Sequence, residues 1–122
     1  MSQKKSILIV DDDPVFQTMH RLLLERAGYR VLSAMNGQEG IDTLQREEVD
    51  VILLDLVMPV MDGCTFLRTF QGLFTRPIPI LIVTGQEWSL DEDLVNNQLI
   101  KKILKKPFHP STLFEAIEAL EE

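Results

Sequence analysis

Residues 7–14 read ILIVDDDP and join a strand, a group of acids and the start of a helix. The run ILIV is continuously apolar and mostly β-branched, as in a strand of a parallel sheet that is covered on both faces. Asp13 followed by Pro14 is typical of a helix N-terminus, with the aspartate as the N-cap and the proline in the first turn. This interpretation leaves Asp11 and Asp12 without a structural reason.

The same alternation of short apolar runs and amphipathic segments continues along the 122 residues. Strands are predicted over 7–10, 29–34, 51–54, 78–83 and 100–104, and helices over 14–27, 37–48, 63–72, 90–99 and 111–120. The first helix carries an apolar stripe that includes Phe16, Met19, Leu22 and Leu23. Strands that alternate with helices form a parallel sheet with helices on both faces. We therefore predict one α/β domain over residues 1–122, a doubly wound five-stranded parallel sheet of order 2-1-3-4-5, which is flavodoxin-like.

Composition excludes several classes of protein. Hydrophobic residues make up 45% of the chain, a value typical of globular domains. The formal net charge of -7 argues against binding to nucleic acid or to an anionic membrane. No stretch approaches the ~18 apolar residues of a membrane span, and no secretory signal is visible. Cys64 is the single cysteine, which fits a reducing compartment, so we expect a cytoplasmic protein.

Charged and polar side chains gather where the predicted strands end. Asp11 and Asp12 follow the first strand, Asp55 the third, Thr84 the fourth and Lys106 the fifth. The carboxyl ends of parallel strands share one edge, where ligands bind at the point at which the strand order reverses. Two adjacent acids at a buried strand end repel each other unless a cation is present, and a few carboxylates suit Mg²⁺. We expect these side chains to form one site.

Asp55 is the most informative single residue, because it interrupts a run over 51–57 that is otherwise apolar. A buried carboxylate costs several kcal/mol unless it is paired or bound to a metal. Beside a metal and a lysine it is compensated, and it can act as a nucleophile, as in enzymes that form aspartyl phosphates. Thr84 would then supply a hydroxyl donor, and Lys106 a cation, for the phosphoryl oxygens.

With these features the chain resembles the receiver domain of two-component response regulators. The resemblance covers roughly residues 6–120 and rests on four segments at the expected spacing, which are 7–14, 50–63, 82–85 and 106–108. It implies that Asp55 is the phosphoacceptor and that Thr84 bonds the phosphoryl group and moves toward it. Lys106 would pair with the phosphoryl group or with the Asp55 carboxylate, and the Lys106–Pro107 peptide bond would be cis.

The resemblance also implies a magnesium site. Asp11, Asp12 and Asp55 would hold the ion, together with the backbone carbonyl oxygen of Val57. Because the Val57 side chain is apolar and does not orient an attacking water, we predict slow self-hydrolysis of the aspartyl phosphate.

The implied function is a phosphorylation-dependent signalling switch rather than an enzyme with turnover. The phosphoryl group would come from a sensor histidine kinase or a phosphotransfer protein. Phosphorylation would change the surface of the last helices and strand, to be read by a downstream protein or a fused output domain. Homodimer formation stays an open option, and the domain would either stand alone or begin a longer regulator. Ile103 occupies a position where family members often carry Tyr or Phe, so that aromatic reporter is absent.

Two alternative functions stay open. The first is a docking module that acts without phosphorylation, which is disfavoured because every acidic, hydroxyl and lysine position of the site is filled. The second is a phosphatase with an aspartate nucleophile. Such enzymes use Asp-x-Asp with the second acid as the proton donor, and Val57 stands at that second position.

Overall fold

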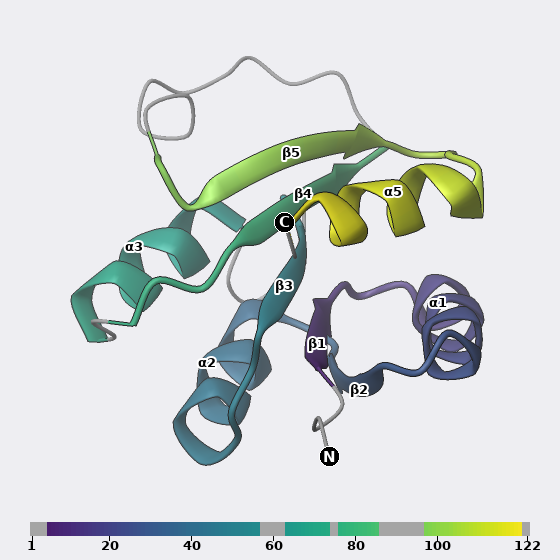
Figure 1. The fold of residues 1–122 in the computed structure, drawn as a ribbon. Coiled ribbons are helices and arrows are strands. Elements are labelled where there is room, and N and C mark those ends of the chain that lie inside the picture. Colours follow the sequence, from purple (N-terminus) through teal and green to yellow (C-terminus); the bar gives the residue numbers. More distant parts are fainter. Residues whose placement is uncertain (1–4, 57–62, 74–75, 86–96, 121–122) are drawn as a thin grey trace.

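The computed structural model describes residues 5–56, 63–73, 76–85 and 97–120. Its elements are shown in Figure 1 and are, in chain order, β1 (Ser6–Val10), α1 (Pro14–Arg26), β2 (Arg30–Ala34), α2 (Gly37–Arg46), β3 (Val51–Asp55), α3 (Gly63–Leu73), β4 (Ile80–Thr84), β5 (Ile100–Lys105) and α5 (Pro110–Leu120). The strands form one parallel sheet of order β2-β1-β3-β4-β5, which confirms the predicted topology. No helix in this described part has the length and apolar character needed to cross a membrane.

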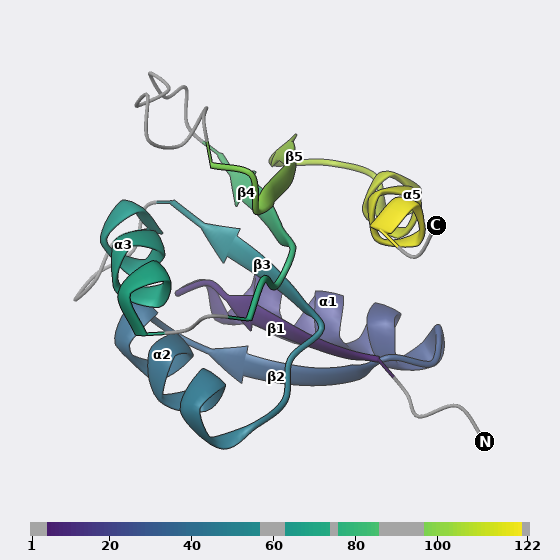
Figure 2. The same ribbon diagram turned by 60° about the vertical axis from the view of Figure 1, so that its left-hand side comes forward.

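Helices cover both faces of the sheet (Figures 1 and 2). The helices α2 and α3 pack on one face, and α1 and α5 pack on the other. Side chains alternate along a strand, so Leu8 and Val10 of β1 join the core under α2 and α3, while Ile7 and Ile9 join the core under α1 and α5. The strands β1, β3 and β4 are therefore buried at every residue, as their continuous apolar runs predicted.

The observed elements differ from their predicted ranges by one or two residues at one end or at both. The strand β4 begins at Ile80 rather than at position 78, because Pro79 has no N–H to give to the ladder. The helix predicted over 90–99 lies mainly outside the described residues. Residues 97–99 are described, and they form a turn that leads into β5 rather than a helical segment.

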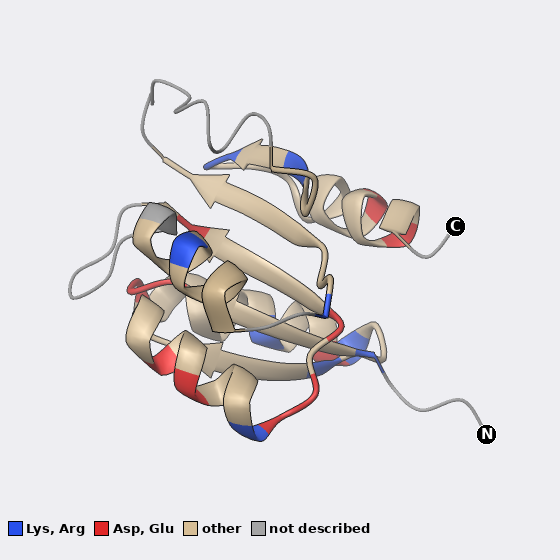
Figure 3. Ribbon diagram, turned by 90° about the vertical axis from the view of Figure 1, so that its left-hand side faces the viewer, with Lys and Arg blue, Asp and Glu red and all other residues tan. Residues whose placement is uncertain are grey.

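The edge strand β5 carries basic residues, which appear blue in Figure 3. Lys101, Lys102 and Lys105 are exposed, and lysines on an edge strand oppose pairing with the edge of another sheet. Ile103 lies among them opposite Ile82 and is 37% exposed. Ile103 is thus a partly exposed isoleucine at a position where members of the family that this chain resembles often carry an aromatic side chain.

Gly40 lies where α2 touches β1, and the contact leaves little room for a side chain. A Cβ atom there would stand 3.0 Å from Phe66 Cε2 and 3.2 Å from Val10 Cγ2. We expect Gly40→Ala to lower the free energy of unfolding by about 1–3 kcal/mol through overpacking. Gly72 is the control: it is exposed on α3, and nothing lies within 4 Å of the place that a Cβ atom would take there.

We expect Gly72→Ala to raise the free energy of unfolding by up to about 1 kcal/mol, because alanine favours the helix. Urea unfolding of both variants measures the difference. A Gly40→Ala variant as stable as the parent chain would contradict the tight packing of α2 on β1.

Candidate functional site

The strand register brings the predicted site residues to one edge of the sheet. The strands β1 and β3 pair up to the end of β1, so Asp11 and Asp55 lie side by side. Thr84 ends β4, and its carbonyl oxygen accepts a hydrogen bond from the Lys106 backbone N–H at 2.7 Å. Asp11, Asp55 and Thr84 are buried, and Lys106 is partly exposed. The Lys106–Pro107 peptide bond is cis, as the family resemblance implied.

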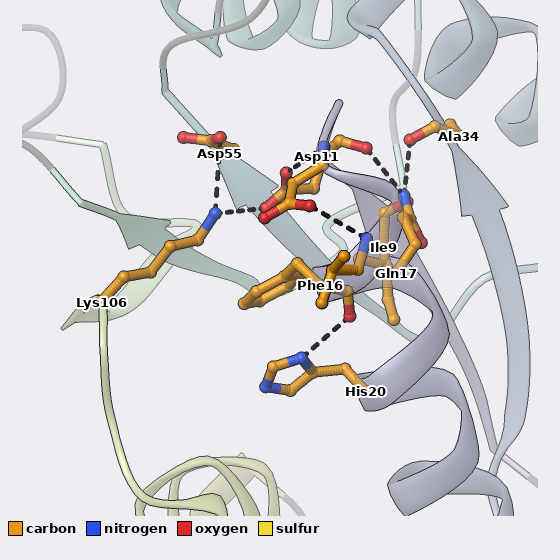
Figure 4. Close-up of polar contacts among 10 residues, drawn as sticks. Ile9, Asp11, Phe16, Gln17, His20, Ala34, Asp55 and Lys106 are labelled. Atoms are coloured by element: carbon orange, nitrogen blue, oxygen red, sulfur yellow. Dashed lines mark hydrogen bonds and ion pairs between the residues drawn. The ribbon is translucent and has the colours of Figure 1, made fainter.

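Lys106 is the cation of the site. Its Nζ lies 2.5 Å from Asp11 Oδ2 and 3.6 Å from Asp55 Oδ2 (Figure 4). The second oxygen of Asp11, Oδ1, accepts a hydrogen bond from the Asp13 backbone N–H at 2.9 Å. Asp11 has a side chain with no exposed surface, so its charge depends on these two partners.

Three carboxylates form a cluster beside this lysine. Asp11, Asp12 and Asp55 each offer an oxygen atom, and these atoms lie within 4.8 Å of one another. Asp12 is exposed, so the cluster opens to solvent. A small set of hard oxygen donors with access for water suits Mg²⁺, which keeps several of its waters when bound. The residues present therefore fit this ion; Val57, the further predicted ligand, lies outside the described residues.

Hydrogen bonds of Asp13 and Gln17 hold the first turns of α1 next to the site. The Asp13 side chain accepts a hydrogen bond from the Val15 N–H at 2.9 Å, which confirms Asp13 as the N-cap. Gln17 is buried, and the two hydrogens of its Nε2 are shared among three backbone carbonyl oxygens within hydrogen-bond distance. These belong to Ile9 at 2.9 Å, Asp11 at 3.0 Å and Ala34 at 2.8 Å. The amide thus ties α1 to the ends of β1 and β2 and holds the Asp11 backbone in place.

The inner face of α1 is more polar than its apolar stripe predicted. Its buried residues are Phe16, Gln17, His20 and Leu24. Met19 and Leu22, which the sequence interpretation assigned to the stripe, are 50% and 55% exposed. The interpretation therefore missed Gln17 and His20. The signal that could have found them is the spacing within this set: His20 follows Phe16 by four residues and Gln17 by three, and Leu24 follows His20 by four, which places these side chains on one side of the helix.

His20 is buried in an aromatic environment beside the site. Its ring stacks on the Phe16 ring with centroids 3.9 Å apart, and its Nδ1 lies 2.9 Å from the Phe16 carbonyl oxygen. A carbonyl oxygen only accepts, so Nδ1 carries the proton. Burial lowers the pKa of His20; the hydrogen bond to Phe16 raises it, the charge of Lys106 lowers it and that of Asp11 raises it.

Burial of His20 makes stability depend on pH. Because its pKa is lowered in the folded chain, the unfolded chain binds the proton more readily. The stability that neutral His20 contributes is thus present above the unfolded pKa of about 6.5 and is lost as the pH falls through the folded value. We expect urea unfolding to show a loss of stability as the pH falls below about 6.5, and this loss to be smaller in His20→Phe. Equal losses in the two proteins would contradict this.

Comparisons with known proteins agree with this fold. The family model described as "Response regulator receiver domain" matches residues 7–118. The chain is 36% identical to Protein PilH of Pseudomonas aeruginosa over 115 residues, which cover 93% of this chain and 95% of that protein. It is also 33% identical over 119 residues to the alkaline phosphatase synthesis transcriptional regulatory protein PhoP of Bacillus subtilis. That match covers 95% of this chain and 48% of the relative.

A solved structure with a bound metal is also similar. It is the receiver domain of sensor histidine kinase PA1611 from Pseudomonas aeruginosa, with a magnesium ion coordinated in its active-site cleft. The TM-score is 0.83 and the sequence identity 28%, over 96% of this chain and 97% of that one.

Proposed function

The chain belongs to the response-regulator receiver family, and from this premise we propose that Asp55 is its phosphoacceptor and that Asp11 and Asp12 hold Mg²⁺ beside it. The chain is a receiver domain of two-component signalling, a module whose phosphorylation acts as a switch. The observation that carries the residue assignment is the position of buried Asp55, with two carboxylates within 4.8 Å and the Lys106 ammonium at 3.6 Å.

Each residue of the site has its own role in the proposed phosphoryl transfer. A carboxylate oxygen of Asp55 attacks the phosphorus of the donor and forms the acyl phosphate. The bond from phosphorus to the leaving group breaks at the same time, and the leaving group keeps the electron pair. Lys106 and the Thr84 hydroxyl supply a cation and a donor for the phosphoryl oxygens. Bound Mg²⁺ would neutralise the negative charge that the carboxylates and the phosphoryl oxygens bring together.

The partners follow from the same chemistry. We propose that the donor in the cell is the phosphohistidine of a sensor histidine kinase or of a phosphotransfer protein. The related PhoP of Bacillus subtilis is a transcriptional regulator of which this chain spans 48%. By analogy, the phosphorylated surface would act on a fused output domain or on a separate protein.

A small phosphodonor tests the proposal without knowledge of the kinase. The chain is incubated with acetyl phosphate and Mg²⁺, or with acetyl phosphate and a chelator, and is weighed intact by mass spectrometry. We expect a gain of one phosphoryl group that requires Mg²⁺ and that persists after the donor is removed, because Val57 offers no group to orient water. No gain by a folded chain would favour a docking module, and release of many phosphates per chain would favour a phosphatase.

A further inference from the structure

Phe16 lies between two ionisable side chains, those of Lys106 and His20. The Lys106 Nζ stands over its ring, 4.2 Å from the centroid, and the His20 ring stacks on it at 3.9 Å with an interplanar angle of 25°. A ring stacked this closely leaves no space on the same face for an ammonium group. Lys106 and His20 therefore occupy opposite faces of the Phe16 ring, an arrangement that can be followed in Figure 4.

A third aromatic ring, that of Phe108, packs near both Phe16 and His20. The Phe108 centroid lies 6.2 Å from that of Phe16 and 5.6 Å from that of His20. Phe108 follows Lys106 by two residues, so the segment that carries the lysine packs against α1 through its own aromatic side chain. We call Phe16, His20 and Phe108 the aromatic cluster.

The cluster gives the lysine a partner that is independent of the carboxylates. The face of an aromatic ring carries negative charge density and attracts an ammonium group. A lysine side chain has four flexible bonds, and a catalytic cation acts best when it is held in place before reaction. Any sharing of the Asp11 carboxylate with a metal ion would weaken its pairing with Lys106, whereas the contact with the ring would stay.

On the basis of the function proposed above, we propose that Phe16, supported by His20, is a positioning residue that holds the Lys106 ammonium beside Asp55 for phosphoryl transfer. Because His20 can be protonated, its contact with Phe16 also makes the position of Lys106 depend on pH. A proton on His20 would place a second cation on the opposite face of the ring and oppose the hold on Lys106. The charged groups that act on His20 are Lys106, which follows β5, and Asp11, which follows β1.

Three variants distinguish the effect of the aromatic ring face on Lys106 from the effect of side-chain packing. Phe16→Met fills a similar volume without a ring face, Phe16→Tyr keeps the face, and His20→Phe keeps the stack without the titration. With acetyl phosphate and Mg²⁺, we expect Phe16→Met to be phosphorylated about three- to thirty-fold more slowly than the parent chain, and Phe16→Tyr to stay within about two-fold. The rate of the parent chain should fall more steeply in acid than that of His20→Phe.

A spectroscopic measurement tests the contact without any phosphorylation. Protons above a ring face are shielded, so we expect the Lys106 Hε signals to lie upfield in the NMR spectra of the parent chain and of Phe16→Tyr, and to return to the usual lysine position in Phe16→Met. An unshifted signal in the parent chain would overturn the inference, as would equal rates for Phe16→Met and the parent. So would equal slowing of the methionine and tyrosine variants. A parent chain that shows the shift but takes no phosphoryl group would refute the proposed function and leave the contact standing.

Discussion

Replacing Asp55 with asparagine is expected to abolish phosphorylation by acetyl phosphate, because a carboxamide cannot form the acyl phosphate. The fold should persist, since the Lys106 pairing with Asp11 does not involve Asp55. Removal of one of three carboxylates that lie within 4.8 Å of one another also relieves repulsion in the absence of metal. The measurement is the intact mass after incubation with donor and Mg²⁺, with circular dichroism to verify folding.

Asp50 offers a matched control for this substitution. It lies just before β3, at the opposite end from Asp55, where it accepts a hydrogen bond from the Ser6 N–H at 2.8 Å and pairs with Arg76 at 3.4 Å. Asp50→Asn should lose about 0.5–1.5 kcal/mol of stability and be phosphorylated at the parent rate. Phosphorylation of Asp55→Asn at that rate would show that the acceptor is elsewhere.

Replacing Lys106 with methionine is expected to slow phosphorylation by about 10²–10³-fold, the usual effect of removing one preorganised group that stabilises developing charge. Methionine keeps much of the apolar stem and removes the ammonium from Asp11, Asp55 and the Phe16 ring. Lys105→Met is the control, because Lys105 is an exposed neighbour on the edge strand, and its loss should leave the rate unchanged.

Binding of Mg²⁺ should stabilise Lys106→Met more than it stabilises the parent chain. Without Lys106 the buried Asp11 carboxylate has lost its cation, so binding of Mg²⁺ to the folded chain should raise the unfolding temperature more in Lys106→Met than in the parent. A parent-like phosphorylation rate in Lys106→Met, or an equal effect in Lys105→Met, would contradict the role given to Lys106.

The sheet could be predicted because its central strands are buried on both faces. Continuous apolar runs indicate such strands directly, and the more polar run at Arg30–Ala34 proved to be the edge strand β2. The right-handed connection rule then leaves few arrangements for strands that alternate with helices. The carboxyl ends of parallel strands share one edge of the sheet, and Asp11, Asp55, Thr84 and Lys106 lie at that edge, as expected.

The environment of the site on α1 could not be predicted in the same way. The helix has apolar residues on more than one side, so hydrophobic periodicity alone did not identify its inner face. Contacts with residues far away in the sequence select that face. The Gln17 amide reaches the carbonyl oxygen of Ala34, and the His20 ring packs against Phe108 near the end of the chain.

The most direct measurement is to locate the phosphoryl group on the chain. After reaction with acetyl phosphate and Mg²⁺, borohydride reduction converts the labile acyl phosphate into a stable alcohol, and peptide fragmentation by mass spectrometry identifies the modified residue. We predict modification at Asp55 alone. Modification at Asp11, Asp12 or another residue instead of Asp55 would contradict the proposal that Asp55 is the phosphoacceptor.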